Sequence, residues 1–281
     1  MADLVMKAST ELTAVVPEFW SALWYPTLLQ ELPFNDLISK DWEGEIASLG
    51  DTVNVTHFPQ FAVAQNIAED ERVDADAITA ENLQLVINKQ TAKDFIVTKK
   101  AMVQSLDVME QLRSHAMYAI MKKMQKDIIA AIVPNASAPD HSIAYDSGTT
   151  LALADLIEAK DLLDAQSVPD DGSRALVTGS AEYNDLFNIT GFVSKDFIPA
   201  GSPLSEGAIN LPVLGFKVRK TTEVGTTSYL FHPMFMTMAV QQAPEVGVYD
   251  LGVDGKRGTR VNMDVLWGLK QLDGLRVVSI G

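Results

Sequence analysis

The chain has 281 residues, 47% of them hydrophobic, and a formal net charge of −15 from 37 acidic and 22 basic side chains. A chain of this size and composition can bury a sizeable core, so we expect a folded protein of two lobes sharing one fold. The absence of cysteine excludes disulfides, thiolate zinc sites and cysteine nucleophiles. The acidic balance opposes tight nucleic-acid binding, and no apolar stretch or basic N-terminal pattern predicts membrane insertion or export.

Residues 1–48 are predicted to form an arm. An apolar, largely aromatic cluster there is interrupted by Pro17, Pro26 and Pro33, which limit continuous helix. Grouped aromatic side chains are poorly tolerated in water, so we expect a neighbouring subunit or the long helix described below to cover them. The arm residues predicted to contact another subunit are Trp20, Trp24 and Tyr25.

Residues 50–98 have the pattern of a long β-hairpin. Residues 52–56 alternate polar and apolar side chains, as in a strand with one covered face, and residues 83–87 and 95–98 supply β-branched partners. Residues 65–81 between them have few large apolar side chains and predict a solvated acidic tip. The tip residues predicted to contact another subunit are Glu69, Asp70, Glu71, Asp74 and Asp76.

Residues 105–133 are predicted to form one long helix. Apolar residues recur there at three- and four-residue steps, Ser105 can cap the start, and Pro134 ends the pattern. Basic positions on this helix have no evident partner within the chain, so we expect the acidic tip of a neighbour to lie over them. These positions are Lys122, Lys123 and Lys126.

The rest of the chain alternates helix and strand patterns, which predicts a layered α/β lobe. We expect a helix at 151–165, a buried strand at 174–178, a short helix at 180–188 and an irregular loop at 191–210. The residues of the first helix predicted to face inward are Leu153, Leu156, Ile157, Leu162 and Leu163. Further strand-like runs lie at 216–218, 229–231, 236–242, 246–251, 260–267 and 275–280.

The glycine-rich run 252–258 could suggest a phosphate-binding loop. A Walker loop needs glycine where Asp250 stands and serine or threonine where Arg257 stands, so the match fails. Because the run lies between two strand-like segments, it is better explained as a hairpin turn. Lys256 and Arg257 in this turn are predicted to face a neighbouring subunit.

No other pattern predicts a catalytic, cofactor or metal site. The 4 histidines are scattered, and no pair has metal-binding spacing. Asp74 and Asp76 have the spacing that begins a calcium loop, but the required glycine and third oxygen ligand are missing. No G-x-S-x-G elbow is present. We therefore expect no enzymatic activity.

Several short motifs accompany this order of parts: residues 41–46 (DWEGEI), 50–55 (GDTVNV), 215–218 (GFKV), 231–233 (FHP), 241–244 (QQAP) and 267–270 (WGLK). Together with the order of parts they resemble the major capsid proteins of tailed bacteriophages, which have the Hong Kong 97-type fold. The resemblance covers nearly the whole chain, although each motif is short.

The resemblance implies an α+β fold with an N-terminal arm, an extended β-hairpin loop, a peripheral domain with a long spine helix and an α/β axial domain. The implied boundaries are 1–48 for the arm, 49–98 for the extended loop, 99–133 with 236–270 for the peripheral domain, and 134–235 with 271–281 for the axial domain.

By the same resemblance, many copies would assemble as pentamers and hexamers into an icosahedral shell that encloses double-stranded DNA without sequence-specific binding. Some members carry a helical scaffolding segment before the arm, whereas here the arm follows Met1 almost directly. Either a separate scaffolding protein guides assembly or such a segment was never present. We expect a separate scaffolding protein and a portal, and a decoration protein is left open. The protein would belong to the virion after assembly in the host cytoplasm, without cofactor or membrane contact. Two alternatives are a non-viral, encapsulin-like compartment shell and a small-oligomer enzyme or binding module.

Overall fold

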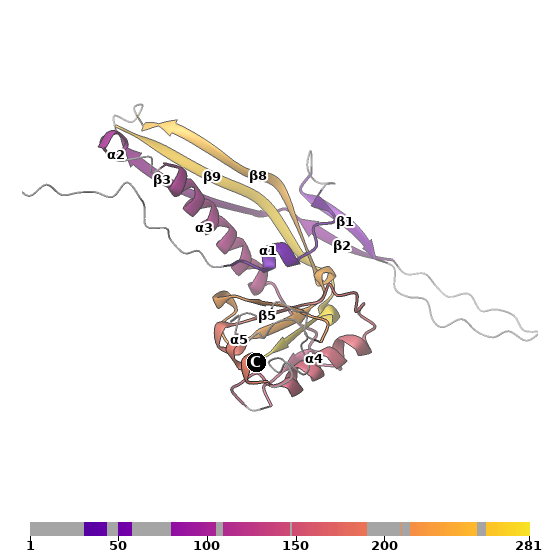
Figure 1. Ribbon diagram of the computed structural model, residues 1–281. Helices are drawn as coiled ribbons and strands as arrows, with labels where there is room; N and C mark the ends of the chain where they lie inside the picture. The colour runs from indigo at the N-terminus through magenta and orange to yellow at the C-terminus, as the bar shows by residue number, and fades with distance from the viewer. Residues whose placement is uncertain are drawn as a thin grey trace, which may run out of the picture.

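The computed structural model describes residues 31–43, 50–57, 80–104, 109–146, 148–189, 209, 214–251 and 257–281. Within these residues the strands form a two-stranded hairpin, a three-stranded sheet and a five-stranded sheet. Figure 1 shows an elongated molecule in which the long strands and a long helix extend away from a rounded lobe. No helix in the described part of the chain is long and apolar enough to cross a membrane.

The long strands form a blade, which we define as β3 (Lys89–Thr98), β8 (Met236–Asp250) and β9 (Gly258–Gln271) together with the helices at residues 99–104 and 109–130 that lie beside them. The sheet order is β3-β9-β8, and β9 pairs antiparallel with both neighbours. Strand β8 is continuous where the sequence predicted two runs, because register shifts around Gln242 interrupt the alternation without ending the pairing. Strands on both sides of the predicted 252–258 turn thus form a hairpin; residues 252–256 lie outside the described residues.

The smaller hairpin pairs β1 (Thr52–His57) with β2 (Glu81–Val86), which confirms the first part of the long β-hairpin predicted at residues 50–98. The expectation that residues 95–98 join this hairpin is wrong. They belong to β3, where Phe95 lies opposite Val261 of β9. Alternation identifies a strand but not its partner, and an apolar partner from the far end of the chain completes this pairing.

The predicted long helix is described as α2 (Lys99–Gln104) and α3 (Met109–Ala130), with residues 105–108 outside the described residues. Its end comes before the predicted Val133. There the side chain of Gln271 accepts a hydrogen bond from the Val133 N–H at 2.8 Å and donates one to the Val133 carbonyl oxygen at 2.5 Å. This side chain satisfies backbone groups that the ended helix leaves free.

Helix α3 lies along the blade and runs toward the five-stranded lobe (Figure 1). Its buried face shares one hydrophobic core with both sheets: Ile120 and Ile128 of the helix, Trp267 of the blade and Phe231 of the lobe all belong to it. The short helix α1 (Phe34–Leu37) joins this core, because Phe34 is fully buried and stacks on Phe231 at 5.5 Å between ring centroids. The end of the predicted arm is therefore built into its own subunit.

The compact lobe is a sheet in the order β4-β10-β7-β5-β6 with two helices, α4 (Leu153–Ala165) and α5 (Ser180–Asp185), the latter followed by a 3-10 turn, η3 (Leu186–Asn188). The fully buried β5 confirms the predicted strand at 174–178. The strands of the lobe are β4 (Ser142–Ile143), β5 (Ala175–Thr178), β6 (Lys217–Lys220), β7 (Ser228–Phe231) and β10 (Val277–Ile280).

The predicted inward face of α4 needs one correction. Leu156, Ala159 and Leu163 are buried, whereas Leu153 and Ile157 are exposed. The buried residues form a single stripe, because α4 covers one face of the sheet and a stripe of that width is all that reaches it. Of the predicted loop at 191–210, the structure describes Ile209, which is buried.

Candidate assembly surfaces

Most residues predicted to contact other subunits lie outside the described residues. These are Trp20, Trp24, Tyr25, Glu69, Asp70, Glu71, Asp74, Asp76 and Lys256. The structure places the remaining ones, Lys122, Lys123, Lys126 and Arg257, on the long helix and beside the β8–β9 turn.

The helix lysines have partners within the chain, so the expectation that they lack one is wrong. Glu223 lies in the turn η4 (Thr222–Val224), and its carboxylate is 2.8 Å from the Lys122 ammonium and 3.3 Å from that of Lys126. Lys123 pairs with Asp127 one turn along the helix at 2.6 Å. The fold brings a turn that is distant in the sequence onto this helix. The helix lysines are therefore no longer a reason to expect a contact with the acidic tip of a neighbouring subunit.

The Glu223 ion pairs predict a pH dependence of stability. Burial raises the pKa of the Glu223 carboxyl, but hydrogen bonds and charge from Lys122 and Lys126 outweigh it and hold the pKa below its ordinary value. The pairs therefore stabilise the fold above the ordinary glutamate pKa, and this contribution disappears as the pH falls through the lowered value. Melting temperatures of wild type and E223Q should differ at neutral pH and converge in acid; a gap independent of pH would contradict the assignment.

The β1–β2 hairpin is fastened to the blade at its base. A Cβ atom on Gly268 of β9 would lie 2.3 Å from the Val86 carbonyl oxygen, so only glycine permits this close approach. A small core containing Val53, Leu85 and Ile87 fills the junction, and the Gln241 side chain donates to the Gly50 carbonyl oxygen at 2.8 Å. The hairpin then projects from the side of the blade (Figure 1).

A groove of about 460 Å³ separates the hairpin from the compact lobe. Val55 and Leu83 line it from the hairpin, Trp42 from the preceding segment, and Met234 and Leu272 from the lobe side. The apolar face of the hairpin therefore continues beyond the part that its own blade covers.

The far end of the blade exposes apolar side chains on both sheet faces. Val248 and Tyr249 of the edge strand β8 are 53% and 59% exposed, and Ile96 of β3 is 60% exposed. Arg257 is exposed nearby, and its carbonyl oxygen accepts a hydrogen bond from the Lys99 N–H at 3.2 Å. An open edge strand with exposed apolar side chains is a surface that other chains can cover.

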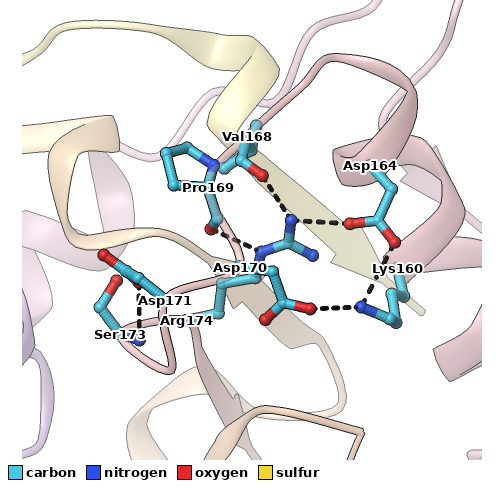
Figure 2. Close-up of polar contacts among 8 residues, drawn as sticks. All are labelled: Lys160, Asp164, Val168, Pro169, Asp170, Asp171, Ser173 and Arg174. Atoms are coloured by element: carbon cyan, nitrogen blue, oxygen red, sulfur yellow. Dashed lines mark hydrogen bonds and ion pairs between the residues drawn. The ribbon is translucent and has the colours of Figure 1, made fainter.

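A buried arginine organises one loop of the compact lobe. The Arg174 side chain is 1% exposed, and its guanidinium donates to the carbonyl oxygens of Val168 at 2.6 Å and Pro169 at 3.0 Å. It also pairs with Asp164 of α4 at 2.7 Å, and Lys160 bridges Asp164 and the loop (Figure 2). No sequence motif predicts this cluster. It holds the loop before β5 against helix α4.

The described residues contain no group of three or more histidine, cysteine, aspartate or glutamate side chains placed to hold a metal ion. His141 is buried, and its Nδ1 lies 3.2 Å from the Val277 carbonyl oxygen. His232 caps a short turn by accepting a hydrogen bond from the Met234 N–H at 3.3 Å. Both side chains pack in the fold and contact polar groups of the backbone.

Comparison with known proteins supplies the family. Residues 82–277 match the family described as phage capsid protein, which is more than half of the chain. No curated protein matches at a significant level.

Solved structures match along almost the whole chain. A chain of Mycobacterium phage Che8 is 22% identical with a TM-score of 0.75, and the match covers 95% of this chain and 97% of that one. The capsid of cyanophage P-SCSP1u is 12% identical with a TM-score of 0.77, covering 96% and 93%. The capsid of cyanophage Pam1 is 17% identical with a TM-score of 0.72, covering 100% and 98%. The chain therefore belongs to the phage capsid protein family and is a shell subunit with the Hong Kong 97-type fold.

Proposed function

We propose that the chain is the major capsid protein of a tailed phage and that its copies assemble, as pentamers and hexamers, into an icosahedral shell around double-stranded DNA. The match of residues 82–277 to the phage capsid protein family supports this most. The surface fits it, because β8, an edge strand among the described residues, ends in exposed apolar side chains although the rest of its sheet shares a well-buried core. Such a surface is typical of a subunit that neighbouring copies cover.

The parts of the fold suggest a role for each segment. The blade with α2 and α3 would be the peripheral domain, and the compact lobe the axial domain. The hairpin, fastened at Gly268 and open beyond it, would reach a neighbouring copy. A scaffolding protein and a portal would be needed to complete a genome-filled head in the host cytoplasm, and the subunit itself would carry no catalytic role.

Removing residues 1–30 should leave soluble, folded subunits that do not assemble. Phe34 already belongs to the core of its own chain, so the deletion spares the described fold and removes the aromatic residues Trp20, Trp24 and Tyr25. Large aromatic side chains carry much of the binding energy of interfaces.

Light scattering and negative-stain microscopy would follow assembly of wild type, the deletion, and a control that lacks only residues 1–10. The control keeps the aromatic cluster and should form particles. Normal particles from the longer deletion would show that the arm is not an assembly contact.

A further inference from the structure

The chain crosses between the blade and the compact lobe in a narrow neck. The crossings lie after α3, between β7 and β8, and between β9 and β10. Backbone hydrogen bonds join these crossings. The Leu272 N–H donates to the Phe235 carbonyl oxygen at 2.8 Å, and the Asn135 N–H donates to the Gly274 carbonyl oxygen at 3.2 Å. The neck is therefore the hydrogen-bonded junction of the three crossings, and it begins next to Val133, just beyond the long helix.

A second attachment between the two parts lies outside the neck. The β6–β7 turn of the compact lobe packs against the C-terminal third of α3, where the Gln125 side chain donates to the Thr221 hydroxyl at 2.9 Å. Both residues are buried, and Glu223 of the same turn receives Lys122 and Lys126. Gln125 lies about 8 Å, at 1.5 Å per residue, before Ala130, the last residue of the helix, and the neck begins beyond that residue. A rotation of the lobe about the neck would therefore break this attachment first.

The shared core resists this rotation as well, because Val224 of the turn is buried in it and protein interiors are close-packed. Within that packing the polar contacts of the turn favour one placement. The buried hydrogen bond between Gln125 and Thr221 weakens steeply when its geometry changes. The Glu223 carboxylate, 10% exposed and reached by lysines from two successive helix turns, favours the placement in which both ammonium groups reach it.

We propose that Glu223 is the positioning residue that sets the angle between the compact lobe and the blade, with Lys122 and Lys126 as its partners on the helix. In a closed shell the subunits of pentamers and hexamers adopt similar internal angles, so a residue that restricts this angle also restricts the curvature of the assembly. The claim about the curvature of the shell rests on the proposed function, whereas the claim about the angle concerns the single subunit.

The angle can be measured in unassembled full-length subunits by double electron–electron resonance. Because the chain has no cysteine, the variants V248C and I157C place spin labels at exposed positions on the blade and on α4 without further changes. Wild type should give one narrow distance. E223Q, which removes the charge and keeps the size, should add a second, broader population. The control E158Q makes the same change at an exposed position of α4 and should match wild type.

Two further variants make the result decisive. K122Q/K126Q changes only helix side chains that are 39% and 55% exposed, so it keeps the fold and should broaden the distance as E223Q does, even if E223Q folds poorly. Exchanging the charges, in K122E/K126E/E223K, should restore one narrow distance. The same single distance in wild type, E223Q and K122Q/K126Q would overturn the proposal. Shells of E223Q should vary in diameter, whereas a lack of shells from wild type would count against the proposed function alone.

Discussion

Replacing Gly268 by alanine should abolish shell assembly, because the added methyl group would lie 2.3 Å from the Val86 carbonyl oxygen and 2.9 Å from the Ile87 side chain. The Val86 oxygen is a backbone atom and cannot turn aside as a side chain can. The hairpin must therefore move away from the blade for the substitution to fit. Overpacking of this kind costs about 1–3 kcal/mol in the subunit. The larger effect falls on assembly, since the displaced hairpin no longer points where a neighbour can receive it.

Gly247 provides a matched control on the adjacent strand. A methyl group there would meet the ring of Tyr249 at 2.8 Å, and that exposed side chain can turn aside. Light scattering should show shells from G247A and none from G268A, with similar circular dichroism for both. Shells from G268A in normal yield would show that the hairpin base does not set the contact between subunits.

Replacing Arg174 by leucine should destabilise the subunit by about 2–6 kcal/mol, or about 1–3 kcal/mol for each buried carbonyl group left without a donor. Leucine fills much of the same space, so the loss comes from the polar groups: the carbonyl oxygens of Val168 and Pro169 lose their donor in a buried place. Asp164 is 43% exposed and can turn to water, so it contributes little to this loss. R174K should be intermediate because an ammonium cannot reach all the acceptors at once.

The neighbouring Lys160 is the control for Arg174. It makes ion pairs with Asp164 and Asp170, both of which are more than two-fifths exposed, so K160M should cost about 0–1 kcal/mol. Denaturant unfolding of the three variants gives the comparison. Equal losses for R174L and K160M would show that the charges matter more than the buried hydrogen bonds.

The sequence predicts an element well where a pattern is local. Alternation at residues 52–57 and the buried run at 175–178 are properties of a few successive side chains, and both strands are present. Partners are a different matter. Strand β3 has the same alternation whether it pairs with β2 or with β9, and only the assembled sheet decides between them.

Contacts between distant segments could not be predicted for a related reason. Lys122 and Glu223 are joined because a turn of the compact lobe packs on the long helix, and neither residue has a flanking motif. Gly268 belongs to the WGLK motif, but the sequence does not show why glycine is needed there, since the reason is the Val86 backbone beside it. The resemblance to a family supplied the order of parts, and the side-chain contacts that hold them came from the fold.

The central claim, that this chain is a shell subunit, is tested most directly by cryo-electron microscopy of the purified full-length protein at increasing concentration, alone, with a crowding agent, and after co-expression with the scaffolding protein of the same phage. We expect closed icosahedral shells whose density accepts the blade and the compact lobe as one subunit, with the β1–β2 hairpin lying on a neighbour. A folded, stable small oligomer that forms no shell under any of these conditions would contradict the claim.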